Sequence, residues 1–438
     1  MHQINLNPMM IRLTLFLTFQ VIAFIHVSWS QSIYFPPTND SEWETMSPQS
    51  LNYCDEKIDS LYAYLEKEET NSFILLKNGK IVLEKYFNSY TKDSVSAWNS
   101  AAKSLMATLI GIANTNDELS LNEPTSTYLG EGWTSLTKLQ EDSITVWHQL
   151  TMTTGLDERE PSCFSPECLT YKTSAGSRWY YHNGPYTLLK DVLQSASGKN
   201  LNIFSNQHLE NKIGMSGFWF QVGDFNLYIS KARDMARFGL LIQNEGFWGT
   251  QPVLNDAVYF ENMVNSSQSL NPSYGYLWWL NGKNSFIAPG GPTSFPGPIA
   301  PDAPTDMIAA AGFEGQYISI SPSEGMVLVR QGKSNSNSEA DLKLLNSVWK
   351  KVLALNCNPN ALLNDEELDR IYIYPNPAKQ HIQIENIPFS TFKIVITNGV
   401  KTIYESENAT NIFNSFAPGI YFLTIKNGSR SITKKLII

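Results

Sequence analysis

The sequence predicts an α/β protein of the α+β kind: an antiparallel sheet packed by helices, with a helical subdomain, followed by a small all-β sandwich. Three observations predict this. A helix and a hairpin begin the first part of the chain, and a second hairpin and a helix end it. A mostly helical segment lies between them. Beyond residue 367 the sequence becomes short alternating runs divided by turns.

The first hairpin is the clearest single element. Apolar runs at 73–76 and 80–83 are joined by Asn78-Gly79, the pair that suits a type I′ turn. Apolar residues at helical spacing predict a helix within 51–67 before it. A proline-free run of helix formers predicts another over 100–113.

The second hairpin predicts that the two ends of this region share one sheet. Runs at 316–320 and 326–330 flank a turn at 321–325, and 340–355 closes the region with a helix. Strands at both ends, with helices between, predict an antiparallel sheet that helices cover. Most of 145–246 is expected to form helices and loops.

The last part of the chain has a different composition. Residues 358–367 are polar and typical of a linker. Alternating runs at 381–384 and 392–396, with Asn-Gly turns at 398–399 and 427–428, predict a small β-sandwich over 368–438. We therefore expect one large domain over 31–357 and a separate sandwich after the linker.

The first thirty residues are typical of a secretory signal peptide. Arg12 precedes an apolar run over 13–27, and Ser28-Trp29-Ser30 supplies small residues for cleavage near position 30. The alternative is a membrane anchor, for which the run is short. No later segment is long and apolar enough to span a bilayer, and the net charge of −9 argues against nucleic-acid binding.

Four cysteines fit an oxidising compartment. Cys163 and Cys168 lie close together in a proline-rich loop, whereas Cys54 and Cys357 lie near the two ends of the first domain. Three pairings are possible, and we favour Cys163–Cys168 with Cys54–Cys357. A metal site is the alternative, but no histidine lies at ligand spacing from either pair, so no metal is expected.

Ser100-Ala101-Ala102-Lys103 is a candidate nucleophile and base. Residues three apart share a helix face, so the serine hydroxyl and the lysine ammonium can meet. A desolvated lysine can lose its proton near neutral pH and act as a base. Ser100 is singled out because it opens a long apolar helix. The same spacing also occurs at Ser89/Lys92, Ser135/Lys138, Ser347/Lys350, Ser390/Lys393 and Ser431/Lys434.

Tyr181-His182-Asn183 is the second candidate group. A phenol beside the serine can relay a proton to a leaving group, and the Asn183 amide can orient the lysine and the substrate. Taken alone, Tyr181 is more often a packed aromatic residue. Tyr86-Phe87-Asn88 has the same spacing but precedes Ser100 in the predicted hairpin.

Together these stretches resemble the serine β-lactamase and penicillin-binding (DD-peptidase) superfamily, nearest its class C and esterase-like branch. The resemblance covers most of residues 50–355 and includes four further blocks, at 144–156, 175–183, 232–239 and 274–279. It implies that Ser100 is the nucleophile, with Lys103, Tyr181 and Asn183 as its catalytic partners. Whether Lys103 or Tyr181 is the main base stays open.

The third element of the superfamily is a strand with Lys-Thr-Gly or His-x-Gly. By resemblance, the matching stretch is Phe313-Glu314-Gly315, with Gly315 allowing close approach of the substrate. By resemblance, the backbone N–H groups of Gln316 and Ser100 would form the oxyanion hole. Phe313 then replaces the basic residue that helps hold a substrate carboxylate.

That replacement favours an ester or amide substrate, small or peptidic, and no cofactor is implied. A β-lactamase or DD-carboxypeptidase is the first alternative, and an arginine or lysine reaching the pocket would favour it. An inactive homologue that binds a cell-surface polymer is the second. The joint presence of Ser100, Lys103, Tyr181 and Asn183 argues against it, because a binding module does not need that set.

The tail has a resemblance of its own. Tyr374-Pro375-Asn376-Pro377, Pro418-Gly419-Ile420-Tyr421 and a terminal Lys434-Lys435-Leu436-Ile437-Ile438 resemble the C-terminal sorting domain of type IX secretion, found in Bacteroidetes. A carbohydrate-binding sandwich is the alternative. The resemblance implies a partner, the type IX machinery, and delivery through the periplasm to the cell surface or the medium.

Overall fold

The structure is a computed structural model that describes residues 33–39, 42–334, 340–357, 371–387, 392–413, 415–427 and 430–438. The expected signal peptide (1–30) and linker (358–367) lie outside the described residues. Within the described part of the chain, no helix is both long and apolar enough to cross a bilayer.

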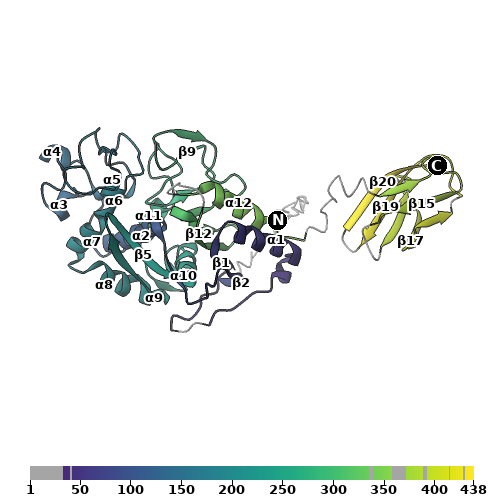
Figure 1. The fold of residues 1–438 in the computed structure, drawn as a ribbon, viewed down its shortest axis with the longest axis horizontal. Helices are drawn as coiled ribbons and strands as arrows, with labels where there is room; N and C mark the ends of the chain where they lie inside the picture. Colours follow the sequence, from purple (N-terminus) through teal and green to yellow (C-terminus); the bar gives the residue numbers. More distant parts are fainter. Residues whose placement is uncertain are drawn as a thin grey trace, which may run out of the picture. The chain divides into compact units, whose positions relative to one another are not determined.

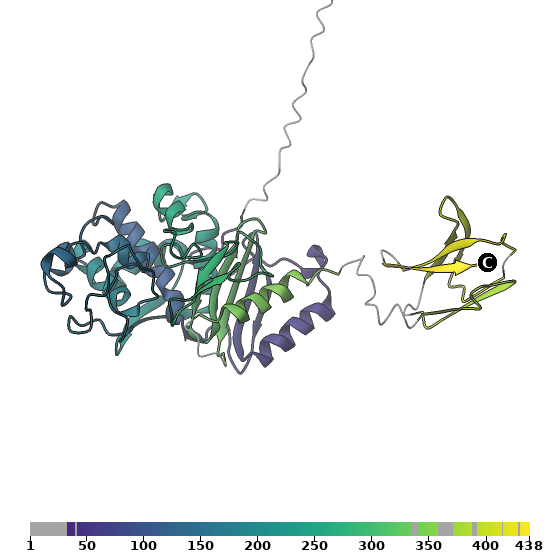
Figure 2. The same ribbon diagram turned by 90° about the horizontal axis from the view of Figure 1, so that it is seen from above.

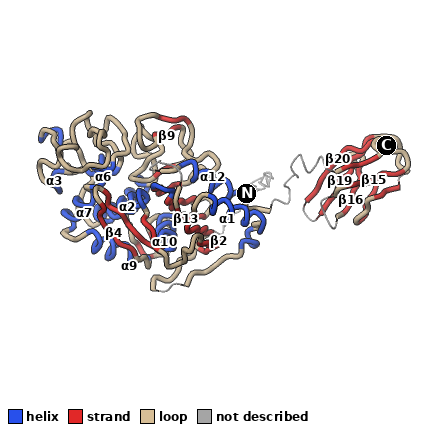
Figure 3. Tube along the Cα trace, viewed as in Figure 1, coloured by secondary structure: helices blue, strands red, loops and turns tan. Residues whose placement is uncertain are grey.

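A six-stranded antiparallel sheet forms the centre of the first domain (Figures 1 and 3). Its strands come from both ends of the domain, as the two sequence hairpins predict, and the mixed α/β fold class is confirmed. Val327, Val329 and Ile318 are fully buried in its middle strands. In spatial order the strands are β2 (Lys80–Tyr86), β1 (Thr70–Lys77), β13 (Met326–Gly332), β12 (Gln316–Ser321), β11 (Ile308–Gly312) and β8 (Trp279–Leu280).

Helices cover both faces of this sheet. Helices α1 (Asp55–Lys67) and α12 (Leu342–Leu353) lie side by side on one face (Figure 2). Helix α10 (Ala232–Gln243) packs against β12 and β13 on the other, where Gly239 lets it approach: a Cβ there would lie 2.5 Å from Val327 Cγ1. Helix α2 (Ala102–Thr115) packs against β11 and is buried along nearly its whole length.

The middle of the chain supplies a helical subdomain and a second, three-stranded sheet. That sheet has the order β3 (Val95–Ala97), β5 (Phe225–Lys231) and β4 (Gly217–Val222). Two short ladders join β6 (Phe247–Trp248) to β7 (Gln251–Pro252) and β9 (Ser285–Ile287) to β10 (Ser294–Pro296). The short helices are α3 (Ser126–Leu129), α4 (Lys138–Glu141), α5 (Val146–Leu150), α6 (Asn183–Thr187), α7 (Leu189–Ser197), α8 (Leu201–Ser205), α9 (Asn211–Ile213) and α11 (Ala257–Met263).

The strands after residue 370 form two separate small sheets. One has the order β14 (Tyr372–Tyr374), β15 (His381–Glu385), β18 (Asn411–Phe413). The other has the order β17 (Thr402–Glu407), β16 (Lys393–Thr397), β19 (Ile420–Asn427), β20 (Arg430–Ile437). Ile382 and Ile412 of the first sheet share a core with Ile394, Leu423 and Leu436 of the second, which makes this segment a β-sandwich.

Both favoured disulfides are present in the structure. Cys54 and Cys357 are bonded, with their Cα atoms 5.0 Å apart, and Cys163 is bonded to Cys168. The first bond joins the residue before α1 to the segment after α12, and Cys54 N–H also donates to Leu355 O at 3.0 Å. The two ends of the first domain are thus fastened together.

Candidate active site

Ser100 lies in a short 3-10 turn, η2 (Asn99–Ala101), that leads directly into α2. Asn99 precedes it with φ of 49°, a left-handed conformation that asparagine tolerates better than most residues. The Asn99 amide donates to Phe313 O at 3.0 Å, and the backbone N–H of the fully buried Trp98 donates to Tyr228 O at 2.8 Å. These contacts fix the turn that carries Ser100 from two sides.

Lys103 lies one helical turn after Ser100 and points back at it. Its Nζ donates to Ser100 Oγ at 3.0 Å, although the side chain is only 4% exposed. The ammonium also lies 4.8 Å from the ring centroid of Tyr181 and 4.4 Å from that of Tyr186. The two rings pack against the amino group and hold this lysine in a defined position.

Tyr181 and Asn183 lie where the chain enters α6. Tyr181 is buried and stacks on Trp279, with ring centroids 6.0 Å apart and planes at 18°. Asn183 is buried at the first position of α6. The structure thus brings Tyr181 to Lys103 and Asn183 to the same pocket as Ser100.

A pocket of about 380 Å³ opens at Ser100. Most of its exposed surface is apolar although several lining residues have polar side chains, and Lys103 is the one charged side chain among the lining residues that the structure describes. Phe313 is 40% exposed at its edge. The lining consists of Asn99, Ser100, Lys103, Asn183, Tyr186, Thr187, Phe225, Asn226, Leu227 and Phe313.

The glycine that abuts Ser100 is Gly312, at the end of β11. A Cβ on Gly312 would lie 2.5 Å from Trp98 O and 3.0 Å from Ser100 N. A Cβ on Gly315 would instead meet Arg330 Nη1 at 2.5 Å, on the far side of the loop. The structure therefore places Gly312, three residues before the Gly315 of the expected third motif, against Ser100.

The other residues of the expected motif lie in the turn at Phe313–Gly315 and at the start of β12. Gln316 begins β12, one strand further into the sheet, and its side-chain amide donates to Gly332 O at 2.6 Å. Of the three expected substrate contacts, Phe313 lines the pocket, whereas Glu314 and Gly315 do not. The stretch Gly312-Phe313-Glu314-Gly315 contains two glycines, and only their packing shows which of them lies against Ser100.

Arg330 lies behind this loop and does not reach the pocket. It is fully buried in β13, and its guanidinium donates to Glu314 O at 3.1 Å and to Gly315 O at 2.7 Å. The same guanidinium donates to Thr70 Oγ1 at 2.9 Å. Arg330 therefore holds the loop after β11 in place and is committed to backbone carbonyls rather than to a ligand.

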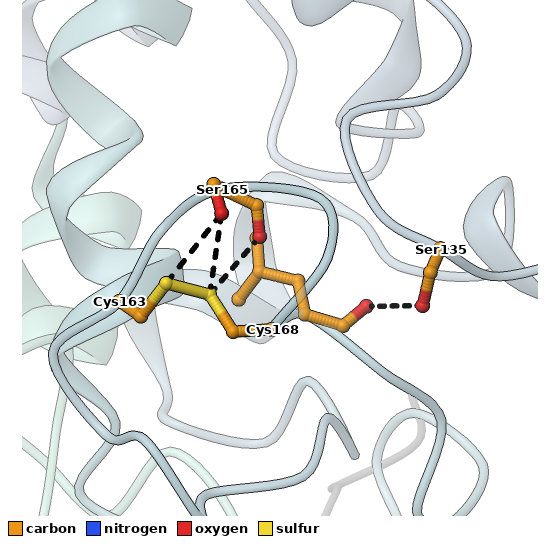
Figure 4. Close-up of a disulfide and its surroundings, with 5 residues drawn as sticks. Ser135, Cys163, Ser165 and Cys168 are labelled. Carbon is orange, nitrogen blue, oxygen red and sulfur yellow. Dashed lines mark hydrogen bonds between the residues drawn. A yellow bond between two sulfur atoms is a disulfide. The ribbon is translucent and has the colours of Figure 1, made fainter.

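The Cys163–Cys168 disulfide closes a short loop (Figure 4). This loop supports the start of α6. Ser165 Oγ lies 3.6 Å from Cys163 Sγ and 3.5 Å from Cys168 Sγ. The loop reaches α6 through Gly184, whose N–H donates to Pro161 O at 2.9 Å. A Cβ on Gly184 would lie 2.1 Å from Cys163 O, so the glycine next to Asn183 permits this contact.

Several residues that line the pocket were not among those predicted from the sequence. Tyr186 lies three positions after Asn183 on α6, a helical spacing that could have indicated it. Burial raises the pKa of Tyr186, so its hydroxyl stays protonated. Phe225, Asn226 and Leu227 come from β5, more than 120 residues after Ser100 in the sequence, and no local signal connects them to it.

The chain belongs to the β-lactamase family, because residues 65–346 match the family model described as beta-lactamase. Residues 372–438 match the model of the secretion system C-terminal sorting domain. The tail is thus a sorting domain of the type IX kind, which carries proteins to the cell surface or beyond it. A search of curated protein sequences finds no match.

Solved structures with the same fold include hydrolases and penicillin-binding protein homologues. A Bacillus anthracis protein assigned as a 6-aminohexanoate-dimer hydrolase has a TM-score of 0.55 and 19% identity, covering 74% of this chain and 88% of its own. A penicillin-binding protein homologue from Caulobacter crescentus has a TM-score of 0.52 and 13% identity, with coverage of 69% and 98%. A family VIII carboxylesterase has a TM-score of 0.52 and 14% identity, with coverage of 68% and 97%. At these identities the likeness concerns the fold.

Proposed function

We propose that the chain is a secreted serine hydrolase that cleaves an ester or amide bond through an acyl-enzyme formed on Ser100. The observation that carries the proposal is the 3.0 Å contact between Lys103 Nζ and Ser100 Oγ at the edge of an apolar pocket. A hydroxyl becomes an effective nucleophile when an adjacent base takes its proton, and Lys103 is within reach to do so.

The reaction would proceed in two steps. Ser100 Oγ attacks the substrate carbonyl while its proton passes to the neutral Lys103 amine. The tetrahedral intermediate then expels the alcohol or amine, which takes the proton by way of Tyr181. In the second step water loses a proton to the same groups and attacks the acyl-enzyme, releasing the acid and restoring Ser100. Asn183 orients the substrate and Lys103 from the start of α6.

Two backbone N–H groups would hold the negative charge that develops on the carbonyl oxygen. One is that of Ser100, at the start of the turn that feeds α2. For the other we propose Phe313, because Gly312 brings the end of β11 against Ser100 N and Phe313 lines the pocket. Preorganised donors of this kind commonly contribute more than any other single feature to acyl transfer.

The lining of the pocket supports a neutral substrate. β11 presents Ile308-Ala309-Ala310-Ala311-Gly312 and carries no basic side chain near Ser100. Arg330 is engaged by backbone carbonyls. A substrate carboxylate, such as that of a β-lactam or a D-Ala-D-Ala peptide, would therefore lack a cationic partner other than Lys103 within the described lining.

We propose the same domain limits that the sequence indicates: a signal peptide over 1–30, the hydrolase over 31–357, a linker over 358–367 and the sorting domain over 368–438. The buried clusters support this division, because one is built from residues 43–355 and another from residues 371–436. The route would run through the periplasm, with the type IX machinery as the partner of the sorting domain.

The test is active-site labelling of the purified chain with a fluorophosphonate and, separately, with a fluorescent penicillin, read by intact mass. We expect a fluorophosphonate adduct on Ser100 and none from penicillin, with Ser100→Ala as the unlabelled control. A stable penicillin adduct would indicate a penicillin-binding peptidase, and penicillin turnover a β-lactamase. No adduct from either reagent would favour a non-catalytic binding protein.

Lys103→Met tests the base directly. We expect the labelling rate of Ser100 to fall by about 10²- to 10⁴-fold, the usual contribution of a positioned base, while the protein stays folded because methionine fills a similar volume. Lys343→Met, on the exposed side of α12, is the matched control and should label at the wild-type rate. A labelling rate of Lys103→Met within threefold of wild type would contradict the assignment.

A further inference from the structure

The outward face of the β4–β5 hairpin is apolar along its whole length. Three cross-strand pairs form this face, which we call the hairpin face: Phe218 with Ile229, Phe220 with Leu227, and Val222 with Phe225. None of the six side chains is buried. The alternate residues Trp219 and Tyr228 point the other way and are buried in the core.

Such a face is unusual for an antiparallel sheet with one side towards solvent. The outward positions of such a sheet are ordinarily polar, because the inward positions already supply the core. Here Phe218 and Val222 are each 53% exposed and Phe225 is 46% exposed, side by side on one surface. Contiguous exposed apolar surface of this kind marks a binding site more often than it occurs by chance.

The hairpin face is continuous with the catalytic pocket. Phe225 and Leu227 belong to both, since they line the pocket that opens at Ser100. Phe313, 40% exposed, lies at the same pocket and extends its apolar edge. A chain that leaves the pocket over Phe225 and Leu227 would meet their cross-strand partners Val222 and Phe220 next, and would then run along β4 to Phe218.

The charges on the hairpin argue against a membrane surface as the occupant. Adsorption to an anionic bilayer normally needs a surplus of lysine and arginine around the apolar residues. The hairpin itself carries Asp224 at its turn and Lys231 at its end, and Lys231 is paired with Asp93 at 2.9 Å. The whole chain has a net charge of −9.

We propose that the hairpin face binds an extended apolar chain of the substrate, so that the bond cleaved at Ser100 belongs to a long-chain acyl ester or amide. This inference rests on the proposed function and names its substrate class. Along β4, Phe218 and Val222 are separated by about 13 Å at the usual rise of a strand, enough to accommodate a medium or long acyl chain. The polar head would leave as the alcohol or amine.

The first test is the dependence of kcat/KM on chain length. With p-nitrophenyl acetate, butanoate, octanoate and dodecanoate below their solubility limits, we expect kcat/KM to rise by up to about fourfold per methylene that gains contact. Phe218→Ser/Val222→Ser should lower the dodecanoate-to-acetate ratio of kcat/KM by about tenfold, equivalent to some 55 Å² of lost apolar contact. Val258→Ser, 72% exposed on α11 and outside the pocket lining, is the matched control and should leave the ratio unchanged.

A second measurement separates this inference from the proposed function. The Ser100→Ala chain cannot form an acyl-enzyme, so its affinity for p-nitrophenyl dodecanoate by calorimetry reports binding alone. We expect binding that Phe218→Ser/Val222→Ser weakens by about tenfold and Val258→Ser does not change. If fluorophosphonate labels Ser100 but kcat/KM does not change with acyl chain length, the inference is overturned and the proposed function stands. The inference is also overturned if Phe218→Ser/Val222→Ser changes the sedimentation of the protein but neither the dodecanoate-to-acetate ratio of kcat/KM nor the affinity for p-nitrophenyl dodecanoate. That result would make the hairpin face an interface between copies of the chain.

Discussion

At the scale of single residues, the position of Ser100 depends on neighbours that perform no chemistry themselves. Asn99 accepts a left-handed backbone and ties the turn to Phe313 O. Gly312 lets the end of β11 approach the backbone of that turn, where any side chain would collide with Trp98 O. The Ser100 hydroxyl is thus positioned by the Asn99 amide and by the absence of a Cβ on Gly312, and Lys103 is positioned by two aromatic rings.

The substitutions Gly312→Ala and Gly315→Ala test which of the two glycines positions the oxyanion donors. Gly312→Ala places a Cβ 3.0 Å from Ser100 N, so we expect the labelling rate of the folded protein to fall by about 10- to 100-fold as the oxyanion donors separate. Gly315→Ala, at φ of 73° and against Arg330, should lower stability with little change in that rate. Labelling rate and melting temperature are measured on both variants. Loss of labelling in Gly315→Ala alone would return the second donor to Gln316.

At the scale of elements, the sequence predicts those whose signal is local. The Asn78-Gly79 hairpin, the strands at 316–321 and 326–332 and the closing helix are all present. The predicted helix at 100–113 begins at Ala102 instead, because Asn99 and Ser100 form a 3-10 turn before it.

Two elements that build the site could not be predicted in this way. β11 contains three consecutive alanines, which favour helix in isolation, and becomes a strand because it pairs with β12. The β4–β5 hairpin lies in a region expected to form helices and loops, and its outward face lacks the polar alternation that signals a half-buried strand. Both elements adjoin Ser100, so the sequence indicated the candidate residues Ser100, Lys103, Tyr181 and Asn183 more fully than the walls of their pocket.

We expect His148, at the start of helix α5, to make the free energy of unfolding depend on pH. His148 Nδ1 accepts the Thr145 backbone N–H at 3.1 Å, as the third residue of a capping box. Burial lowers the pKa of His148 from 6.5 to about 4, so the folded chain keeps it neutral while the unfolded chain protonates it below 6.5. Stability is therefore complete above pH 6.5 and is lost as the pH falls towards 4.

Glutamine at this position can accept the same bond without titrating. Between pH 7 and 4.5 we expect the wild-type chain to lose about 1–2 kcal/mol more unfolding free energy than His148→Gln, a value reduced because the ring is partly exposed. Urea unfolding at several pH values measures the difference. At pH 8 both proteins should agree within about 0.5 kcal/mol. Parallel pH profiles for the two would show that His148 does not titrate on unfolding in this range.

At the scale of the whole molecule, the hydrolase and the sorting domain each have a hydrophobic core of their own. The hydrolase core draws on residues from Trp43 to Leu355, and Cys54–Cys357 fastens its first helix to its last. The sorting domain has a separate core around Ile394 and Leu423. A tail that serves for export needs no part in catalysis, and the pocket at Ser100 takes all its lining from the hydrolase.

A chain that ends at residue 357 tests this independence. It keeps the Cys54–Cys357 bond, the Cys357 N–H to Asn52 O bond and the whole buried cluster, so we expect its melting temperature to stay within about 2 °C of the hydrolase transition in the full chain. Fluorophosphonate labelling of Ser100 should proceed at an unchanged rate. Replacing both cysteines, as Cys54→Ser/Cys357→Ser in the same shortened chain, should lower stability by about 2–5 kcal/mol, because the bond closes a loop spanning nearly the whole domain. If the shortened chain lost labelling while keeping its melting transition, the sorting domain would have a part in the active site, and the division into a catalytic body and an export tail would fail.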